Sequence, residues 1–133
     1  LDEALKMMRE EGLDNIFLRH NKHKLAMSNA VKALNLKLFA DEKYLSPSIT
    51  AIKTEEIDAE EFRKTIKNNF DILLAGGQDH LKGKIFRVGH LGYVNDRDII
   101  SVVSAISNTL LSLGKISAQQ AGEALIVASK YLK

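Results

Sequence analysis

The stretch GKIFRVGHLG, residues 83–92, carries most of the information about fold and function in this chain. Apolar residues surround its one arginine, which predicts a strand from Lys84 to His90 that presents Arg87 on one face. A guanidinium is costly to bury unless it meets an anion, and its planar fork fits a carboxylate through two hydrogen bonds. Arg87 is therefore a candidate anion receptor. The alternative is an edge-strand arginine paired with a surface acid, and spacing alone favours this alternative.

The first part of the chain predicts two helices. Residues 2–11 follow a helical pattern that Gly12 ends as a C-cap, and a second helix begins with Asp14 as N-cap and continues to Leu34. The apolar residues of this second helix recur at helical spacing and should face the core; they are Met27, Ala30, Val31 and Leu34. Because the chain begins in mid-helix without an initiator methionine, we expect it to be a piece of a longer protein.

The remaining residues alternate between short strands and helices. Besides the strand of Arg87, strands are expected at Leu36–Phe39, Ser48–Lys53 and Asp71–Ala75, with a loop at 41–44. Three capping patterns mark the starts of helices: Asp58 with Glu61, Asn95 with Asp98, and Ser117 with Gln120. The helix after Asn95 has the clearest apolar stripe, made of Ile99, Val103, Ile106, Leu110 and Leu113.

This order of elements predicts an α+β fold. Few strands, joined partly by short loops, indicate a two-layer sandwich in which a small, mostly antiparallel sheet is covered by helices on one face. The 133 residues fit one domain that can bury a real core, and no repeat or linker divides them. We therefore expect residues 1–133 to form a single domain.

Composition excludes several function classes. The 19 basic and 17 acidic side chains give a net charge of +2, without the strong basic excess typical of nucleic-acid binding. The absence of cysteine excludes disulfides, thiolate metal sites and cysteine nucleophiles. No apolar run is long enough to span a bilayer, and no signal peptide is recognisable. We expect a cytoplasmic protein without a membrane or nucleic-acid partner.

Two histidines form the only pattern that could suggest a metal. His20 and His23 stand three residues apart on a helix, but a third ligand is missing, and Lys22 and Lys24 would repel a cation. A solvated helix face is the better interpretation. The same holds for the idea that residues 19–24 contact phosphates, because acidic residues precede them and no aromatic residue is interleaved.

The segment from Gly76 to Gly83 is a glycine-rich connection between two strands. It lacks the spacing of a phosphate-binding loop or a dinucleotide fingerprint. It could approach a ligand closely, with Gln78, Asp79 and His80 at its tip. It could equally be a long hairpin connection whose glycines adopt positive φ. His90, on the strand face opposite Arg87, is interpreted as structural.

The block AGGQDHLKGKIFRVGHLG, residues 75–92, resembles the closing signature of class V pyridoxal-phosphate aminotransferases. It is similar to the branch that contains alanine–glyoxylate, serine–pyruvate and archaeal aspartate aminotransferases, some members of which are called soluble hydrogenase small subunit. Segments 11–20 and 33–36 resemble the helix that opens the small domain of this family. Segment 48–52 resembles its first long strand, and 95–114 its penultimate helix.

The resemblance implies roles for particular residues. In this family the arginine of the Phe-Arg-Val-Gly segment binds the α-carboxylate of the amino-acid substrate, and this role carries over to Arg87. Gly77 and Gln78 belong to a segment that resembles a loop near the substrate entrance, which makes them weaker substrate-binding candidates. Asp79 stands where relatives more often have glycine. No catalytic, cofactor-binding or metal-ligating residue is expected in this chain.

The resemblance also implies what lies elsewhere. The family's Schiff-base lysine and phosphate-binding residues belong to a large domain that would precede Leu1, with residues 1–12 as the end of an interdomain helix. No lysine here matches the lysine motif, and imine chemistry needs one. We therefore expect pyridoxal phosphate in the full-length enzyme, none in this chain, and no activity of this chain alone. The implied partners are an amino acid or 2-oxo acid, the large domain, and a second copy in a homodimer.

Two other functions remain open at this point. The chain could be a stand-alone α+β module that binds a carboxylate or regulates another protein. It could also belong to a related pyridoxal-phosphate lyase or cysteine desulfurase, although the absence of cysteine argues mildly against a desulfurase.

Overall fold

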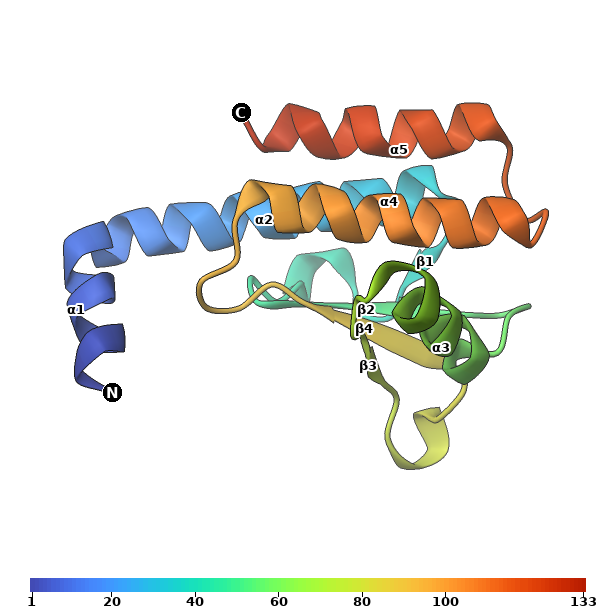
Figure 1. The fold of residues 1–133 in the computed structure, drawn as a ribbon, viewed down its shortest axis with the longest axis horizontal. Helices are drawn as coiled ribbons and strands as arrows, with labels where there is room; N and C mark the ends of the chain where they lie inside the picture. Colours follow the sequence, from blue (N-terminus) through green and yellow to red (C-terminus); the bar gives the residue numbers. More distant parts are fainter.

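The structure is a computed structural model that describes all residues 1–133; Figure 1 shows the arrangement of its helices and single sheet. The helices are α1 (Asp2–Glu11), α2 (Leu13–Ala33), α3 (Ala59–Phe70), α4 (Asp96–Ser112) and α5 (Ala118–Tyr131). The strands are β1 (Lys37–Leu38), β2 (Ile49–Lys53), β3 (Ala75–Gly76) and β4 (Ile85–Gly89). Two short 3₁₀ helices, η1 (Glu42–Tyr44) and η2 (Asp79–Leu81), lie in the connections.

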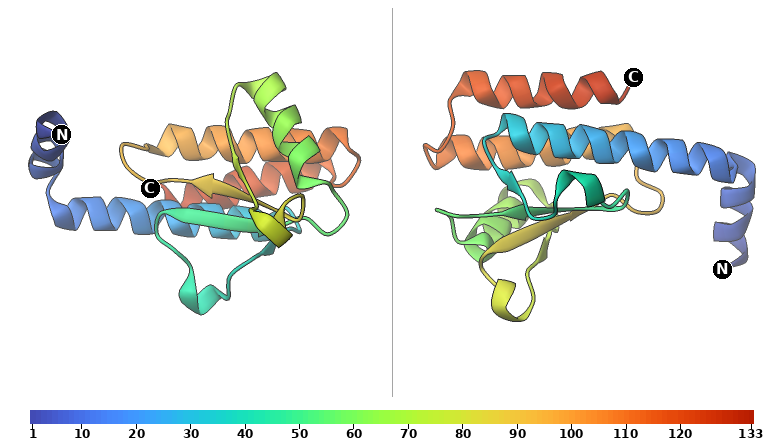
Figure 2. Two further views of the ribbon diagram at one scale, coloured as in Figure 1. Left: turned by 90° about the horizontal axis from the view of Figure 1, so that it is seen from below. Right: turned by 180° about the vertical axis from the view of Figure 1, so that it is seen from behind.

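The sheet is antiparallel throughout, with strand order β1-β2-β4-β3. Helices α2 and α4 lie above one face of this sheet, and α5 lies above both of them (Figure 1). The opposite face carries no α-helix, as the view from below in Figure 2 shows. This arrangement confirms the expected α+β fold with helices on one side of a small antiparallel sheet.

Alternation along the strands divides the sheet into a buried and an open face. Thr50 and Ile52 of β2, with Phe86 and Val88 of β4, are buried under the helices. The Phe86 ring packs against Phe62 of α3, with ring centroids 5.2 Å apart. The helical face of the core confirms the predicted apolar positions: Met27, Ala30, Val31 and Leu34 of the α2 region, and Ile99, Val103, Ile106 and Leu110 of α4, are buried.

The helix starts agree with the predicted capping patterns. Asn95 and Ser117 form complete capping boxes with Asp98 and Gln120. The Asp58 side chain accepts hydrogen bonds from two backbone N–H groups at the start of α3, without a reciprocal bond from its expected partner. Each cap satisfies N–H groups that the first turn of a helix leaves unpaired.

Three sequence predictions are wrong. Asp14 is not an N-cap, because Gly12 with φ 83° turns the chain so sharply that α2 begins at Leu13. Residues 71–74 are not a strand: Asp71 adopts a left-handed conformation that ends α3, and pairing begins only at Ala75. Leu113 is half exposed, since it lies past the last full turn of α4. The expected loop at 41–44 contains the 3₁₀ turn η1, capped by Asp41.

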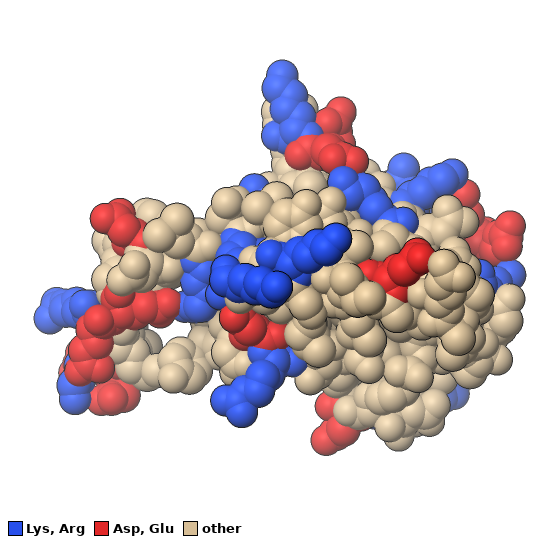
Figure 3. Space-filling view, turned by 90° about the horizontal axis from the view of Figure 1, so that it is seen from above, with Lys and Arg blue, Asp and Glu red and all other residues tan.

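Helix α1 lies beyond the end of the sheet and turns sharply from the N-terminal end of α2 (Figure 1). It buries no residue, and apolar side chains on this arm are exposed; they are Leu5, Met8, Leu13, Phe17 and Leu18. On the face seen from above, basic and acidic side chains are interspersed (Figure 3). No helix of the structure combines the length and the apolar character needed to cross a membrane.

Candidate functional site

Arg87 lies at the middle of β4, which is an interior strand paired with β2 on one side and β3 on the other. Its side chain is half-buried and belongs to the open face of the sheet, opposite the buried Phe86 and Val88. The residues directly across from it in both neighbouring strands are alanines, Ala51 and Ala75. Small side chains on both flanks leave the guanidinium open to an approaching ligand.

The guanidinium of Arg87 is held on one side and free on the other. Its Nε donates a hydrogen bond to the Gly76 carbonyl oxygen at 2.9 Å. Arg87 takes part in none of the ion pairs of the structure. The alternative of an edge-strand arginine with an acidic partner is therefore wrong. Both terminal nitrogens remain available to an acceptor from outside the chain.

In the glycine-rich connection beside Arg87, neighbouring atoms pack closely against Gly76 and Gly77. A Cβ atom on Gly77 would overlap the Leu81 carbonyl group, and one on Gly76 would come within 2.5 Å of the Arg63 side chain. Neither glycine has positive φ; the hairpin interpretation of positive-φ glycines holds only at Gly83. The second residue with positive φ in this connection is Asp79, at 49°, and not a glycine.

The tip of this connection is open to solvent. Gln78, Asp79 and His80 are exposed, and none of their side chains has a hydrogen-bond partner in the structure. Gly77 is half-buried, and its N–H donates to the Ile85 carbonyl at 3.2 Å. The structure thus places Gly77 and Gln78 next to the Gly76 carbonyl that holds Arg87.

His90 is a buried structural residue on the face away from Arg87. Its Nδ1 donates to the Pro47 carbonyl oxygen at 3.1 Å, so its Nε2 accepts from the Thr50 hydroxyl at 2.9 Å. Burial lowers the pKa of His90 to about 4, and the Pro47 hydrogen bond opposes this shift only in part. A neutral imidazole therefore joins the end of β4 to the segment before β2.

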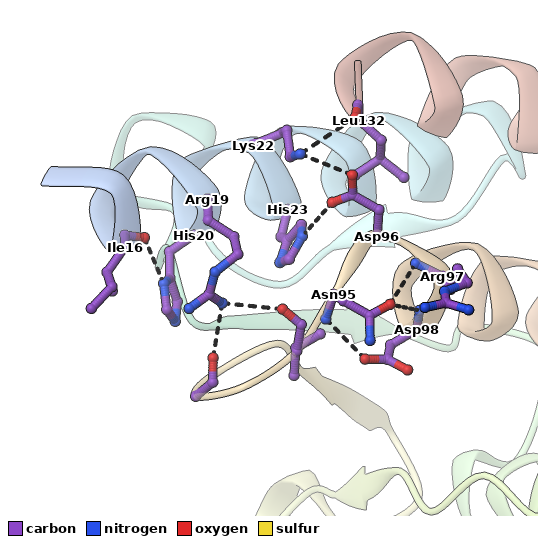
Figure 4. Close-up of polar contacts among 12 residues, drawn as sticks. Ile16, Arg19, His20, Lys22, His23, Asn95, Asp96, Arg97, Asp98 and Leu132 are labelled. Atoms are coloured by element: carbon purple, nitrogen blue, oxygen red, sulfur yellow. Dashed lines mark hydrogen bonds and ion pairs between the residues drawn. The ribbon is translucent and has the colours of Figure 1, made fainter. Parts of the chain in front are cut away.

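A polar cluster lies where α2 crosses the start of α4 (Figure 4). Asp96 accepts hydrogen bonds from Lys22 Nζ and from His23 Nε2, both at 2.9 Å. Desolvation lowers the pKa of the buried His23 despite this carboxylate. Desolvation alone would raise the pKa of Asp96, but the hydrogen bonds from Lys22 and His23 hold it below its usual value.

His20 does not join His23 at a metal site. Its Nδ1 lies 2.8 Å from the Ile16 carbonyl oxygen one turn earlier in α2. No group of three or more histidine, cysteine, aspartate or glutamate side chains has the arrangement needed to hold a metal ion. The predicted solvated helix face is wrong for His23, which is fully buried and hydrogen-bonded to Asp96.

Arg19 joins α1, α2 and the loop after β4, a role that residue patterns did not predict; Figure 4 shows its bonds to this loop. Its Nε and Nη2 bind the Glu11 carboxylate at 2.6 and 2.8 Å, which lowers the pKa of Glu11. Its Nη1 donates to the carbonyl oxygens of Gly92 and Val94 in the loop after β4. The pairing depends on the sharp turn at Gly12, and no local spacing signals it.

The chain's lysines do not fit covalent attachment of an aldehyde cofactor. Imine-forming lysines need a desolvated amine, and no lysine of this chain is buried. A groove of about 320 Å³ between the β1–β2 end of the sheet and the α4–α5 turn contains three lysines. Two of them, Lys37 and Lys115, are paired with Glu55 and Glu56. The structure therefore provides an arginine whose two terminal nitrogens are free, and none of its lysines is buried.

Several known proteins are similar to this chain over most of its length. The soluble hydrogenase 42 kDa subunit of Anabaena cylindrica is 54% identical over 114 residues, which are 86% of this chain and 30% of that protein. The serine–glyoxylate aminotransferase of Methylorubrum extorquens is 32% identical over 136 residues, covering 100% of this chain and 33% of that protein. The chain belongs to the class V aminotransferase family.

Solved structures support the same family and show that its members share the fold of this chain. The crystal structure of ureidoglycine–glyoxylate aminotransferase from Bacillus subtilis matches with a TM-score of 0.87 and 30% identity, over 96% of this chain and 34% of that one. No family model matches the chain. The chain spans about a third of the length of these class V relatives. The family expected from residues 75–92 is thus confirmed, as is its small-domain fold.

Proposed function

We propose that this chain is the C-terminal small domain of a pyridoxal-phosphate-dependent aminotransferase. In this proposal Arg87 binds the α-carboxylate of the amino acid and of the 2-oxo acid. The observation that supports it most is a half-buried guanidinium on an open sheet face, without an acidic partner and with both terminal nitrogens free. A planar fork of this kind matches a carboxylate in geometry and charge.

In the proposed enzyme Arg87 acts by positioning its substrate. Pyridoxal phosphate, bound by the large domain, supplies the electron sink for amino transfer. Two hydrogen bonds from Arg87 to the carboxylate would fix the direction of the substrate's Cα–H bond, and this orientation lowers the barrier without moving a proton. The alanines that flank Arg87 let the carboxylate reach it. The Gly77–Gln78 segment would lie near the substrate entrance.

The same proposal assigns the large domain as the main partner of the chain. The open sheet face and the exposed apolar side chains of the α1–α2 arm are the surfaces available to it. Residues 1–12 would form the end of the interdomain helix. Since no lysine of the chain is buried, the chain alone should be inactive. The full-length enzyme is expected to be a cytoplasmic homodimer.

The proposal is tested by replacing Arg87 in the full-length protein. Arg87→Ala should raise KM for the amino acid and for the 2-oxo acid alike, by about 10- to 100-fold, because a charge-assisted hydrogen bond contributes about 1.5 to 3 kcal/mol. Arg87→Lys keeps the charge but loses the planar fork of the guanidinium. Its KM values should therefore lie between those of the wild type and those of Arg87→Ala. Steady-state kinetics with both substrates measures this.

The matched control is Arg97→Ala, which removes an exposed arginine whose side chain makes no hydrogen bond. Its KM values should stay within twofold of those of the wild type. If Arg87→Ala leaves both KM values unchanged, the proposed role of Arg87 is wrong.

A further inference from the structure

The Gly76 carbonyl restricts how Arg87 can hold an anion. A guanidinium offers two bidentate edges: a side edge that includes Nε, and an end edge formed by the two terminal nitrogens. The hydrogen bond from Nε to Gly76 occupies the side edge. A carboxylate must therefore meet the end edge, and the direction of that edge depends on where the Gly76 carbonyl lies.

The strand that carries this carbonyl is too short to be held by pairing alone. β3 has two residues, Ala75 and Gly76, which pair with Arg87 and Phe86 of β4. It is the edge strand of the sheet, so nothing pairs with its other side. The segment before it, 71–74, makes no ladder contact. Some other contact must hold this edge in place.

Arg63 of α3 supplies that contact. Its Nε donates to the Leu74 carbonyl oxygen at 2.8 Å, and its Nη1 pairs with Glu60 on the same helix at 2.8 Å. The Arg63–Glu60 pair lies directly on Gly76, because a Cβ atom there would come within 2.5 Å of Arg63 Nη1 and 2.6 Å of Glu60 Oε1. α3 therefore contacts this edge at two points: at Leu74, just before β3, and at Gly76, whose carbonyl orients Arg87.

We propose that Arg63, anchored by Glu60, is a positioning residue for the substrate-binding arginine. It acts through β3: it fixes the Leu74 and Gly76 backbone, and Gly76 in turn fixes the end edge of the Arg87 guanidinium. A side chain in place of Gly76 would displace the Arg63–Glu60 pair. This role rests on the proposed function of Arg87.

The test is a set of kinetic measurements on the full-length protein with two kinds of amino donor. One donor is the amino acid, and the other is a primary amine of similar size that lacks the carboxylate. Arg63→Gln should raise KM for the amino acid about fivefold, the equivalent of about 1 kcal/mol, while KM for the amine and kcat stay within twofold. Arg63→Lys, which can still donate to the Leu74 carbonyl, should recover part of the loss.

Glu60→Ala provides a second variant that should fold readily, since the Glu60 side chain is partly exposed and lies on the surface of α3. It leaves Arg63 in place without its anchor and should raise KM for the amino acid less than Arg63→Gln does. Arg97→Gln is the matched control and should leave both donors unaffected.

Three results would overturn the role of Arg63. If Arg87→Ala raises KM for the amino acid while Arg63→Gln and Glu60→Ala do not, Arg87 binds the carboxylate without help from α3. An equal rise of KM for the amine would show a general loss of structure. If Arg87→Ala itself has no effect, the proposed function fails, and the role of Arg63 fails with it.

Discussion

At the scale of single residues, the three partly buried arginines of the chain differ in their partners. Arg19 binds the Glu11 carboxylate and Arg63 pairs with Glu60, whereas Arg87 has only a backbone carbonyl as partner. A half-buried guanidinium without an anionic partner is energetically unfavourable unless a bound ligand supplies the anion. This contrast within one chain is the reason to assign ligand binding to Arg87.

His90 predicts a specific dependence of stability on pH. Its pKa of about 4 in the folded chain lies below the ordinary histidine value of 6.5. Between these two values the unfolded chain binds a proton that folded His90 does not, so stability decreases as the pH falls from 6.5 to 4. The loss of unfolding free energy caused by His90 should reach about 3 kcal/mol when the pH has fallen to 4. His23, whose pKa is also lowered by burial, adds in the same direction.

Urea unfolding followed by circular dichroism at several pH values measures this contribution. His90→Gln should give a flatter decrease of unfolding free energy between pH 6.5 and 4 than the wild type. His80→Gln, at an exposed position, should follow the wild-type curve. Identical slopes for His90→Gln and the wild type would contradict the assignment of His90 as a buried neutral residue.

Part of the site could be predicted from residue patterns. Alternation along 84–90 correctly placed Arg87 and His90 on opposite faces, because side-chain direction in a strand follows from local geometry. The partners could not be predicted. Whether Arg87 meets an acid depends on which strands flank β4, and its bond to Gly76 depends on the register with β3.

At the scale of elements, the β3–β4 connection begins at two adjacent glycines, Gly76 and Gly77. Neighbouring atoms occupy the place that a Cβ atom would take at either position. A Cβ atom at Gly77 would overlap the backbone of Leu81, whereas one at Gly89 would meet no atom within 4 Å. A backbone overlap cannot be relieved by rotating a side chain, so the 3₁₀ turn η2 would have to move.

This contrast gives a paired prediction on stability. Gly77→Ala should lower the free energy of unfolding by about 3 kcal/mol, in the range of changes caused by strain at a constrained backbone position. Gly89→Ala should change it by less than about 1 kcal/mol. Thermal unfolding of both variants provides the measurement. Equal melting temperatures would mean that the connection adapts without cost, and that Gly77 has no structural requirement.

Predictability from sequence also varies among the elements. The caps at Asn95 and Ser117 were predictable because capping uses residues only three positions apart. The strand expected at Asp71–Ala75 was not, because an apolar run looks the same whether it pairs or only packs. Leu74 is buried, yet its carbonyl is bound by Arg63 and not by a neighbouring strand.

At the scale of the whole molecule, the two faces of the sheet have different roles. Helices bury Ile52, Phe86 and Val88 on one face, and the other face presents Arg87 between two alanines. The α1–α2 arm extends beyond this core (Figure 1), and several of its apolar side chains are exposed. Both features fit the proposal that this domain completes its site against another part of a longer enzyme. Under this proposal, residue patterns of the chain alone cannot define the whole site.

The most direct test of the central claim is a crystal structure of the full-length protein with pyridoxal phosphate and an amino-acid substrate analogue. We expect the α-carboxylate to lie within about 3.2 Å of both terminal nitrogens of Arg87, while Nε keeps its bond to Gly76. A carboxylate bound by another residue, with the Arg87 guanidinium facing solvent or paired with an acid of the large domain, would contradict it.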